Sequence, residues 1–390
     1  MRNVWILTLA QALAACGTIV LVTFGGIVGT RIAPTPVLAT LPLSLSIVGL
    51  ASMSLPAAML MQRVGRRPAF VGSAIIAAIA AVLAAISVAT ENFPLFCLAG
   101  FLIGSNMAFV QQYRFAAIEF VDTSLAGKAV ATVMIGTLVA AVVGPTLGGL
   151  AGDIGEMPQY TVSFLILSAL CLLAALVLTR LPASIPRHQR DDAGRDRGIK
   201  EIISDPGYRL AVLGGLSSYA VMSFIMTATP LSMHVHDGFS TTETTAVITG
   251  HLLGMYLPSL ATPWLVAKLG IRRMMSAGIV ANVICIVIAA FAGHHFLHYF
   301  SALVLLGIGW NLMFVAATTL LSTTYSSGER FRAQGFNDFA VFGSQAVASL
   351  LAGVAIETLG WKWLNLVSLP LLVLTAWSLY RVDAVRSASS

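Results

Sequence analysis

The feature that most constrains this chain is a series of long apolar segments separated by short polar breaks. A bilayer-spanning helix needs about 20 mostly apolar residues. Twelve segments have that length and composition, at residues 4–28, 37–61, 68–90, 94–117, 128–151, 160–180, 208–232, 242–267, 274–293, 297–323, 335–356 and 361–380. The period-two alternation of a membrane barrel is absent from them. The sequence therefore predicts an all-α polytopic membrane protein with twelve transmembrane helices.

The charge content excludes several other classes of protein. Only 10% of the 390 residues are charged, whereas soluble domains carry roughly 25%. This deficit argues against a soluble enzyme and against a nucleic-acid-binding protein, despite the net charge of +6. We also find no nucleotide-binding loop, metal-hydrolase motif or paired carboxylates, so the chain is predicted not to be an enzyme. The four cysteines lie in apolar runs at wide spacing, which excludes a zinc ribbon.

Basic residues predict the orientation in the membrane. They concentrate in alternate connections, as in Arg63–Arg67 and Lys268–Arg273, while the opposite connections hold only Arg31 and Lys362. Cytoplasmic loops carry the excess of Lys and Arg. Both termini are therefore predicted to be cytoplasmic, and the partner of the apolar surface is the lipid bilayer.

A single long polar stretch divides the chain into two halves. Residues 181–207 form a predicted cytoplasmic linker between a six-helix half, 1–180, and a second six-helix half, 208–390. The connection after the second segment reads QRVGRRP and the one after the eighth reads AKLGIRRM. Basic residues around a glycine thus recur at the same place in each half, which is the internal symmetry typical of transporters.

The first of these connections resembles the loop motif of the major facilitator superfamily, Gly-x-x-x-Asp-Arg-x-Gly-Arg-Arg. The matching residues are Arg63, Gly65, Arg66 and Arg67, whereas Ala58 and Gln62 replace the glycine and the aspartate. Residues 144–149, GPTLGG, resemble a motif of drug/proton antiporters, although close helix packing explains these small residues equally well. The resemblance covers nearly the whole chain and implies a secondary transporter that works by alternating access, functional as a monomer and without a cofactor.

Ionisable residues inside the spans are functional candidates. Arg114, with Glu119 five residues later, lies near the inner end of the fourth segment, and Asp338 lies near the inner end of the eleventh. Arg114 and Glu119 either neutralise each other or act, with Asp338, in gating or coupling. No carboxylate lies at the predicted midplane, which argues against an exporter of organic cations.

Two pairs of soft ligands do lie near the midplane. Met222 and Met226 are four residues apart in the seventh segment, and His251 and Met255 are four apart in the eighth. Residues at this spacing share one helix face, and both pairs are about 14–15 Å from the predicted outer surface at 1.5 Å per residue. Thioethers with one imidazole favour Cu(I). Ordinary helix packing remains the alternative explanation, because methionine is a common packing residue.

The two pairs resemble the motifs of the CcoA-type copper importers, a bacterial branch of the superfamily. This resemblance implies that Met222, Met226, His251 and Met255 bind copper. It also implies import across the bacterial cytoplasmic membrane for assembly of a haem–copper cytochrome c oxidase. A sister branch without the Met/His set is associated with riboflavin uptake. A small-molecule transporter of the same fold, either a riboflavin importer or a drug/proton antiporter, is thus the alternative.

Further residues are candidates for contact with the cargo. Met233, His234 and His236 follow the seventh segment in an outer connection, where they are predicted either to capture copper or to be solvated loop residues. By analogy with the fold of the family, the fourth and tenth segments contribute candidate cavity residues, namely Asn106, Met107, Gln111, Trp310 and Asn311.

Overall fold

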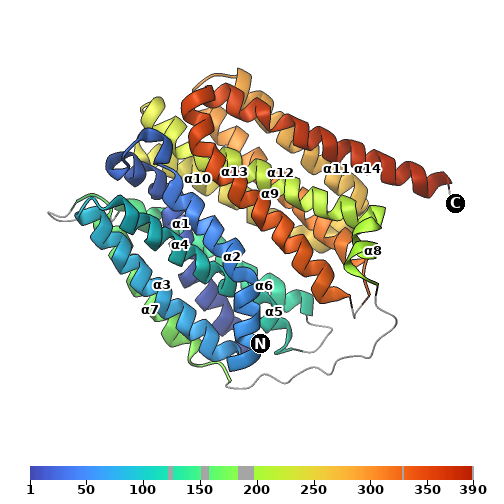
Figure 1. Ribbon diagram of the computed structural model, residues 1–390, viewed down its shortest axis with the longest axis horizontal. Coiled ribbons are helices and arrows are strands. Elements are labelled where there is room, and N and C mark those ends of the chain that lie inside the picture. The colour runs from blue at the N-terminus through green and yellow to red at the C-terminus, as the bar shows by residue number, and fades with distance from the viewer. Residues whose placement is uncertain (122–125, 151–157, 183–196, 327–328, 389–390) are drawn as a thin grey trace. The chain divides into compact units, whose positions relative to one another are not determined.

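The computed structural model describes residues 1–121, 126–150, 158–182, 197–326 and 329–388, and most of these residues are helical (Figure 1). The α-helices are α1 (Arg2–Ile32), α2 (Leu41–Val64), α3 (Arg66–Ala89), α4 (Phe93–Val110), α5 (Tyr113–Ile118), α6 (Ala126–Leu150), α7 (Thr161–Leu178), α8 (Ile199–Ser204), α9 (Pro206–Pro230), α10 (Thr241–Tyr256), α11 (Thr262–Phe291), α12 (Phe296–Ser322), α13 (Arg330–Val367) and α14 (Leu369–Ala388). Nine stretches of the described residues are long and apolar enough to cross a membrane, and the last, Arg332–Val382, contains two helices. The predicted all-α class is confirmed.

The predicted segments coincide with helices, but three of the helical runs are interrupted. The fourth segment divides into α4 and α5 at Gln111 and Gln112. The eighth changes from α10 to a 3-10 turn at Leu257–Ala261, and α13 has a non-helical residue at Gly360. The first two breaks carry no charge, so hydropathy alone does not reveal them, whereas Gly360 lies between the predicted segments 335–356 and 361–380.

The repeated loop has the same backbone geometry in both halves. Gly65, between α2 and α3, has φ 89° and ψ 162°, and Gly270, inside α11, has φ 74° and ψ 162°. This region of backbone space is essentially restricted to glycine. The internal repeat seen in the sequence is therefore a repeat of backbone conformation.

The chain forms two compact units. The first contains Met1–Arg187, Thr227–Thr249 and Ser349–Glu357, and the second contains His188–Met226, Gly250–Ala348 and Thr358–Ser390. Parts of α9, α10 and α13 thus pack with the N-terminal helices. The boundaries 1–180, 181–207 and 208–390 remain a prediction from sequence.

Glycines bring α2 and α4 into backbone contact in the first unit. A Cβ added at Gly104 would meet the carbonyl oxygen of Ser46, and one added at Gly100 would meet that of Pro42. Small residues permit such close approach between membrane helices, where dispersion contacts replace the hydrophobic effect as the source of association. Beside this contact, two buried apolar clusters surround Phe70 with Tyr113 and Phe96 with Phe164.

We predict that Gly104→Ala destabilises the protein. The added methyl would force α2 and α4 apart, at a cost of about 1–3 kcal/mol. Thermal unfolding of the purified protein in detergent measures the effect. Gly72→Ala in α3 is the matched control, because a Cβ there meets nothing within 4 Å in the described part of the chain. Equal melting temperatures for the two variants would contradict the proposed close contact.

Candidate functional site

Helix α12 holds α10 through three residues spaced one turn apart. Leu303, Gly307 and Asn311 lie at i, i+4 and i+8, on one face of α12. A Cβ at Gly307 would meet the carbonyl oxygen of His251 and, at 2.8 Å, the backbone nitrogen of Met255. The glycine therefore allows α12 to touch the backbone of α10 between the two residues of the predicted HxxxM motif.

His251 is fixed by this contact in one orientation. Its Nδ1 lies 2.8 Å from the carbonyl oxygen of Leu303. Because a carbonyl can only accept, Nδ1 carries the proton and donates. In the neutral ring Nε2 then has a lone pair. The side chain is fully buried, and Nε2 has no hydrogen-bond partner among the described residues. Nε2 is thus available to a metal ion or to a donor group of a cargo molecule.

Asn311 completes the attachment of α10. Its Nδ2 donates to the carbonyl oxygen of Met255 at 2.7 Å and to Oγ of Ser259 at 2.5 Å. The first of these bonds holds the last turn of α10 and the second holds the 3-10 turn that follows it. Asn311, predicted as a cavity residue, therefore positions the main chain next to Met255.

The three methionines of the predicted copper set are buried in the second unit. Met222 and Met226 in α9 are 7% and 5% exposed, and Met255 is 5% exposed. Tyr219 lies three residues before Met222, so it shares their helix face. Burial is equally expected of packing residues, and the assignment of all four residues to one metal ion remains a prediction.

An aromatic cluster lies in the second unit, next to Asn311 in the chain. Trp310 stacks on Phe314 with ring centroids 5.3 Å apart, and Tyr219 presents its edge to both rings at 5.2 and 5.0 Å. Phe342 and Tyr256 extend the cluster at 5.6 Å from Tyr219 and 6.0 Å from Trp310. Nε1 of Trp310 is buried and lacks an acceptor in the described part of the chain. Sequence reasoning identified Trp310 but missed the cluster, because its members come from four helices.

One of the candidates for gating or coupling, Glu119, forms an ion pair that sequence spacing did not indicate. Glu119 accepts two hydrogen bonds from the guanidinium of Arg66, the second of them at 2.9 Å from Nε, and pairs with it rather than with Arg114. Arg114 lies over the ring of Phe115 at 4.9 Å. Of the other loop-motif residues, Arg63 is exposed and Arg67 half-buried. The exposed Asp338 accepts a hydrogen bond from Asn337. A role in gating or coupling remains a prediction for Arg114, Glu119 and Asp338.

The three residues predicted to capture copper, Met233, His234 and His236, have different surroundings. Met233 is fully buried, Nδ1 of His234 bonds to the carbonyl oxygen of Phe239 at 2.7 Å, and Nε2 of His236 lies 3.2 Å from Glu357. Within the described residues no group of three His, Cys, Asp or Glu side chains is arranged to hold a metal ion. Capture of copper by these residues remains a prediction from sequence.

Comparison with known proteins identifies the family. A model of the Major Facilitator Superfamily matches residues 7–231 and 211–390. The chain belongs to the major facilitator superfamily. Members of this superfamily that resemble it include the riboflavin transporter RfnT of Brucella anthropi, which is 39% identical over 378 residues, covering 96% of this chain and 94% of RfnT. The uncharacterised MFS-type transporter YdeG of Bacillus subtilis is 28% identical, covering 97% and 92%.

A solved structure of a superfamily member has the same fold. It is a bacterial homologue of the human lysosomal transporter Spinster, in an inward-facing and occupied conformation. The two chains align with a TM-score of 0.74 over 98% of this chain and 96% of that one, at 17% identity. The predicted multi-pass transporter fold is confirmed. The predicted copper cargo is not supported by these comparisons.

We predict that Asn311→Leu weakens the attachment of α10 and lowers transport. Loss of the amide removes the donor to Met255 and Ser259, at a cost of about 1–3 kcal/mol for buried groups left unpaired. Thermal unfolding and uptake measure the two effects. Asn365→Leu is the matched control, because within the described part of the chain the amide of this buried asparagine donates to Trp361 of its own helix. A loss in the control as large as in Asn311→Leu would show that the interhelical bonds have no special role.

Proposed function

We propose that this superfamily member takes up riboflavin or a solute with a similar fused aromatic ring. The observation that carries the proposal is the 39% identity to the riboflavin transporter of Brucella anthropi along almost the full length of both chains. The predicted orientation of the chain and the bacterial relatives support a place in a bacterial cytoplasmic membrane, with both termini inside.

The aromatic cluster supports this class of cargo. Flat ring systems bind in apolar pockets that also offer a few polar groups to fix orientation. The rings of Tyr219, Trp310 and Phe314 offer stacking and edge contacts of the kind worth about 0.5–1.5 kcal/mol per pair beyond burial. The N–H of Trp310, which has no acceptor among the described residues, is a donor for a carbonyl or ring nitrogen of the solute, and Nε2 of His251 is an acceptor for its N–H or O–H groups.

Copper import is the second candidate, and the orientation of His251 favours it. Metal-binding histidines usually donate the second ring N–H to a carbonyl or carboxylate, which fixes the tautomer. His251 does this to Leu303. With Met222, Met226 and Met255 as thioether ligands, its Nε2 would complete a neutral set suited to Cu(I).

We predict that the gene supports growth of a riboflavin-requiring bacterial strain at limiting riboflavin, and that labelled riboflavin accumulates in the cells. Trp310→Phe should raise the KM for uptake about tenfold, since it keeps an aromatic ring but removes one hydrogen bond to the solute. A tenfold change corresponds to about 1.4 kcal/mol. Phe291→Leu, at an exposed position of α11, is the control for membrane insertion.

One combination of results would reject the riboflavin proposal and favour copper import. If riboflavin uptake is absent and the gene instead restores cytochrome oxidase activity to a copper-limited strain, the cargo is copper. The Met/His set would then be the binding site, and the riboflavin proposal would be rejected.

Two substitutions of His251 distinguish a hydrogen bond to riboflavin from coordination of copper. We predict that His251→Gln retains part of the uptake because its amide oxygen still accepts a hydrogen bond, whereas His251→Met abolishes uptake. For a copper site the order reverses, because a thioether is a soft ligand and an amide is a poor one. Uptake of labelled riboflavin and of labelled copper by both variants, normalised to the amount of protein in the membrane, gives the order.

A further inference from the structure

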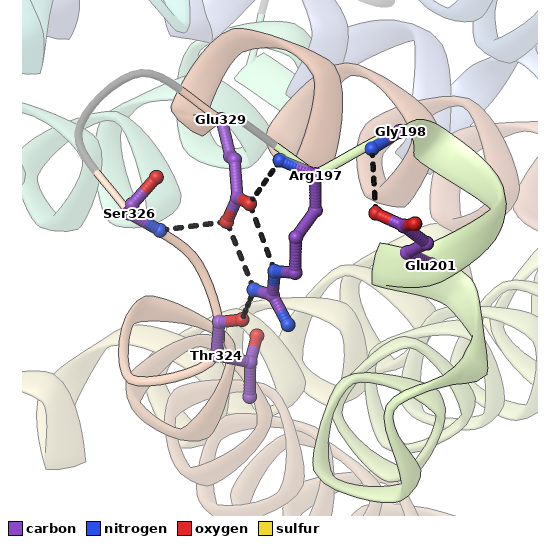
Figure 2. A network of polar contacts seen from close by, with 6 residues as sticks. All are labelled: Arg197, Gly198, Glu201, Thr324, Ser326 and Glu329. Carbon is purple, nitrogen blue, oxygen red and sulfur yellow. Dashed lines mark hydrogen bonds and ion pairs between the residues drawn. The ribbon is translucent and has the colours of Figure 1, made fainter. Parts of the chain in front are cut away.

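The C-terminal end of the predicted linker is bound to the connection between α12 and α13. Both the backbone N–H and Nε of Arg197 donate to one carboxylate oxygen of Glu329 at 2.8 Å, and a terminal guanidinium nitrogen donates to the other oxygen at 2.8 Å. The same guanidinium donates to the carbonyl oxygen of Thr324 at 2.7 Å. Figure 2 shows these contacts, with the N–H of Ser326 as a further donor to Glu329 at 2.9 Å.

Burial makes this contact more than an ordinary surface ion pair. The Glu329 side chain is only 3% exposed, whereas that of Arg197 is 38% exposed. A carboxylate withdrawn from water requires nearly complete hydrogen bonding, and truncation of its partner leaves an uncompensated charge. Four donors satisfy Glu329, three of them from Arg197.

The contact does not respond to pH in the physiological range. Hydrogen bonds from the Arg197 side chain, then from Ser326, hold the pKa of Glu329 well below its usual value. A carboxyl group whose pKa is lowered on folding stabilises the folded form above its ordinary pKa, and this contribution is lost only as the pH falls toward the lowered value. Between about pH 5 and 8 the pair therefore stays charged, which fits a lasting attachment rather than a pH switch.

The corresponding ion pair of the N-terminal half is made without the linker. There Arg66, directly after Gly65, pairs with Glu119. In the second repeat the residue directly after Gly270 is Ile271, which cannot form an ion pair. The C-terminal half instead binds its loop carboxylate, Glu329, with an arginine from the linker.

We propose that Arg197 is an anchor that joins the end of the linker to the C-terminal half, so that both move as one body during transport. Without the anchor, the first attached residue after the linker would be Ile202 of α8, whose side chain is fully buried. With it, the junction lies five residues earlier in the chain. At about 3.3 Å per extended residue, the anchor shortens the reach of the linker by up to about 17 Å. It thereby limits how far the linker lets the two halves separate at the predicted cytoplasmic side.

A spin label at Gly198→Cys tests the anchor directly. Gly198 is exposed, its φ is −65°, and a Cβ there meets nothing within 4 Å among the described residues. The four native cysteines are buried, which favours selective labelling. In otherwise unchanged full-length protein in detergent, we expect the label to give a broad, immobilised spectrum.

We predict that Glu329→Gln and Arg197→Ala at least double the mobile fraction of this label. Arg197→Lys should have an intermediate effect, because an ammonium keeps the charge but cannot bridge both carboxylate oxygens and Thr324. The matched control is Lys200→Glu, a charge change at an exposed residue three positions from Arg197.

Either of two results overturns the proposal. One is an immobilised label in both Glu329→Gln and Arg197→Ala. The other is an equal gain of mobility in Lys200→Glu, which would indicate a general charge effect. Arg197→Ala keeps the test valid if Glu329→Gln fails to fold, because the Arg197 side chain is partly exposed, whereas that of Glu329 is buried. The measurement needs no cargo, so its outcome is independent of whether the protein carries riboflavin or copper.

Discussion

The absence of water in the hydrocarbon region is the constraint on which this structure depends. Each backbone N–H and C=O there must find a partner within the protein, and helices achieve this within a single segment. The same rule applies to polar side chains, several of which bond to a carbonyl one turn earlier, as Thr23 does to Ile19. Buried polar atoms without a partner are therefore informative. Nε2 of His251 and Nε1 of Trp310 are two atoms without a partner among the described residues, and they lie in the same compact unit.

The candidate site forms where helix α12 packs directly against the backbone of helix α10. Gly307 lets α12 approach α10 closely enough for Leu303 and Asn311 to bond to His251 and to the carbonyl of Met255. A larger residue at position 307 would separate the helices and remove both bonds. The orientation of the imidazole is thus decided by a residue without a side chain, and both candidate cargoes depend on that orientation.

Charged side chains serve a different purpose from the buried polar ones. The pairs Arg66–Glu119 and Arg197–Glu329 lie in connections between helices, at the side predicted to be cytoplasmic. Each joins a loop to a segment distant in the chain, by 53 and 132 residues respectively. Besides the orientation that the distribution of basic residues predicts, Arg66 and Arg197 therefore also bind loops to distant segments of the chain.

The sequence by itself determined the fold class, the positions of the helices and the recurrence of the glycine loop. These features follow from local properties: the length of an apolar run, and a backbone geometry that glycine alone adopts readily at positions 65 and 270. It also identified His251, Trp310 and Asn311 as candidates. Only the tertiary structure decided that Glu119 pairs with Arg66, that Arg197 binds Glu329, and that Tyr219 packs against Trp310, Phe314 and Phe342. The physical reason is that ion pairs and ring contacts form between residues far apart in the chain. Which of many similar side chains meet is set by how the helices pack, and local sequence does not encode that choice.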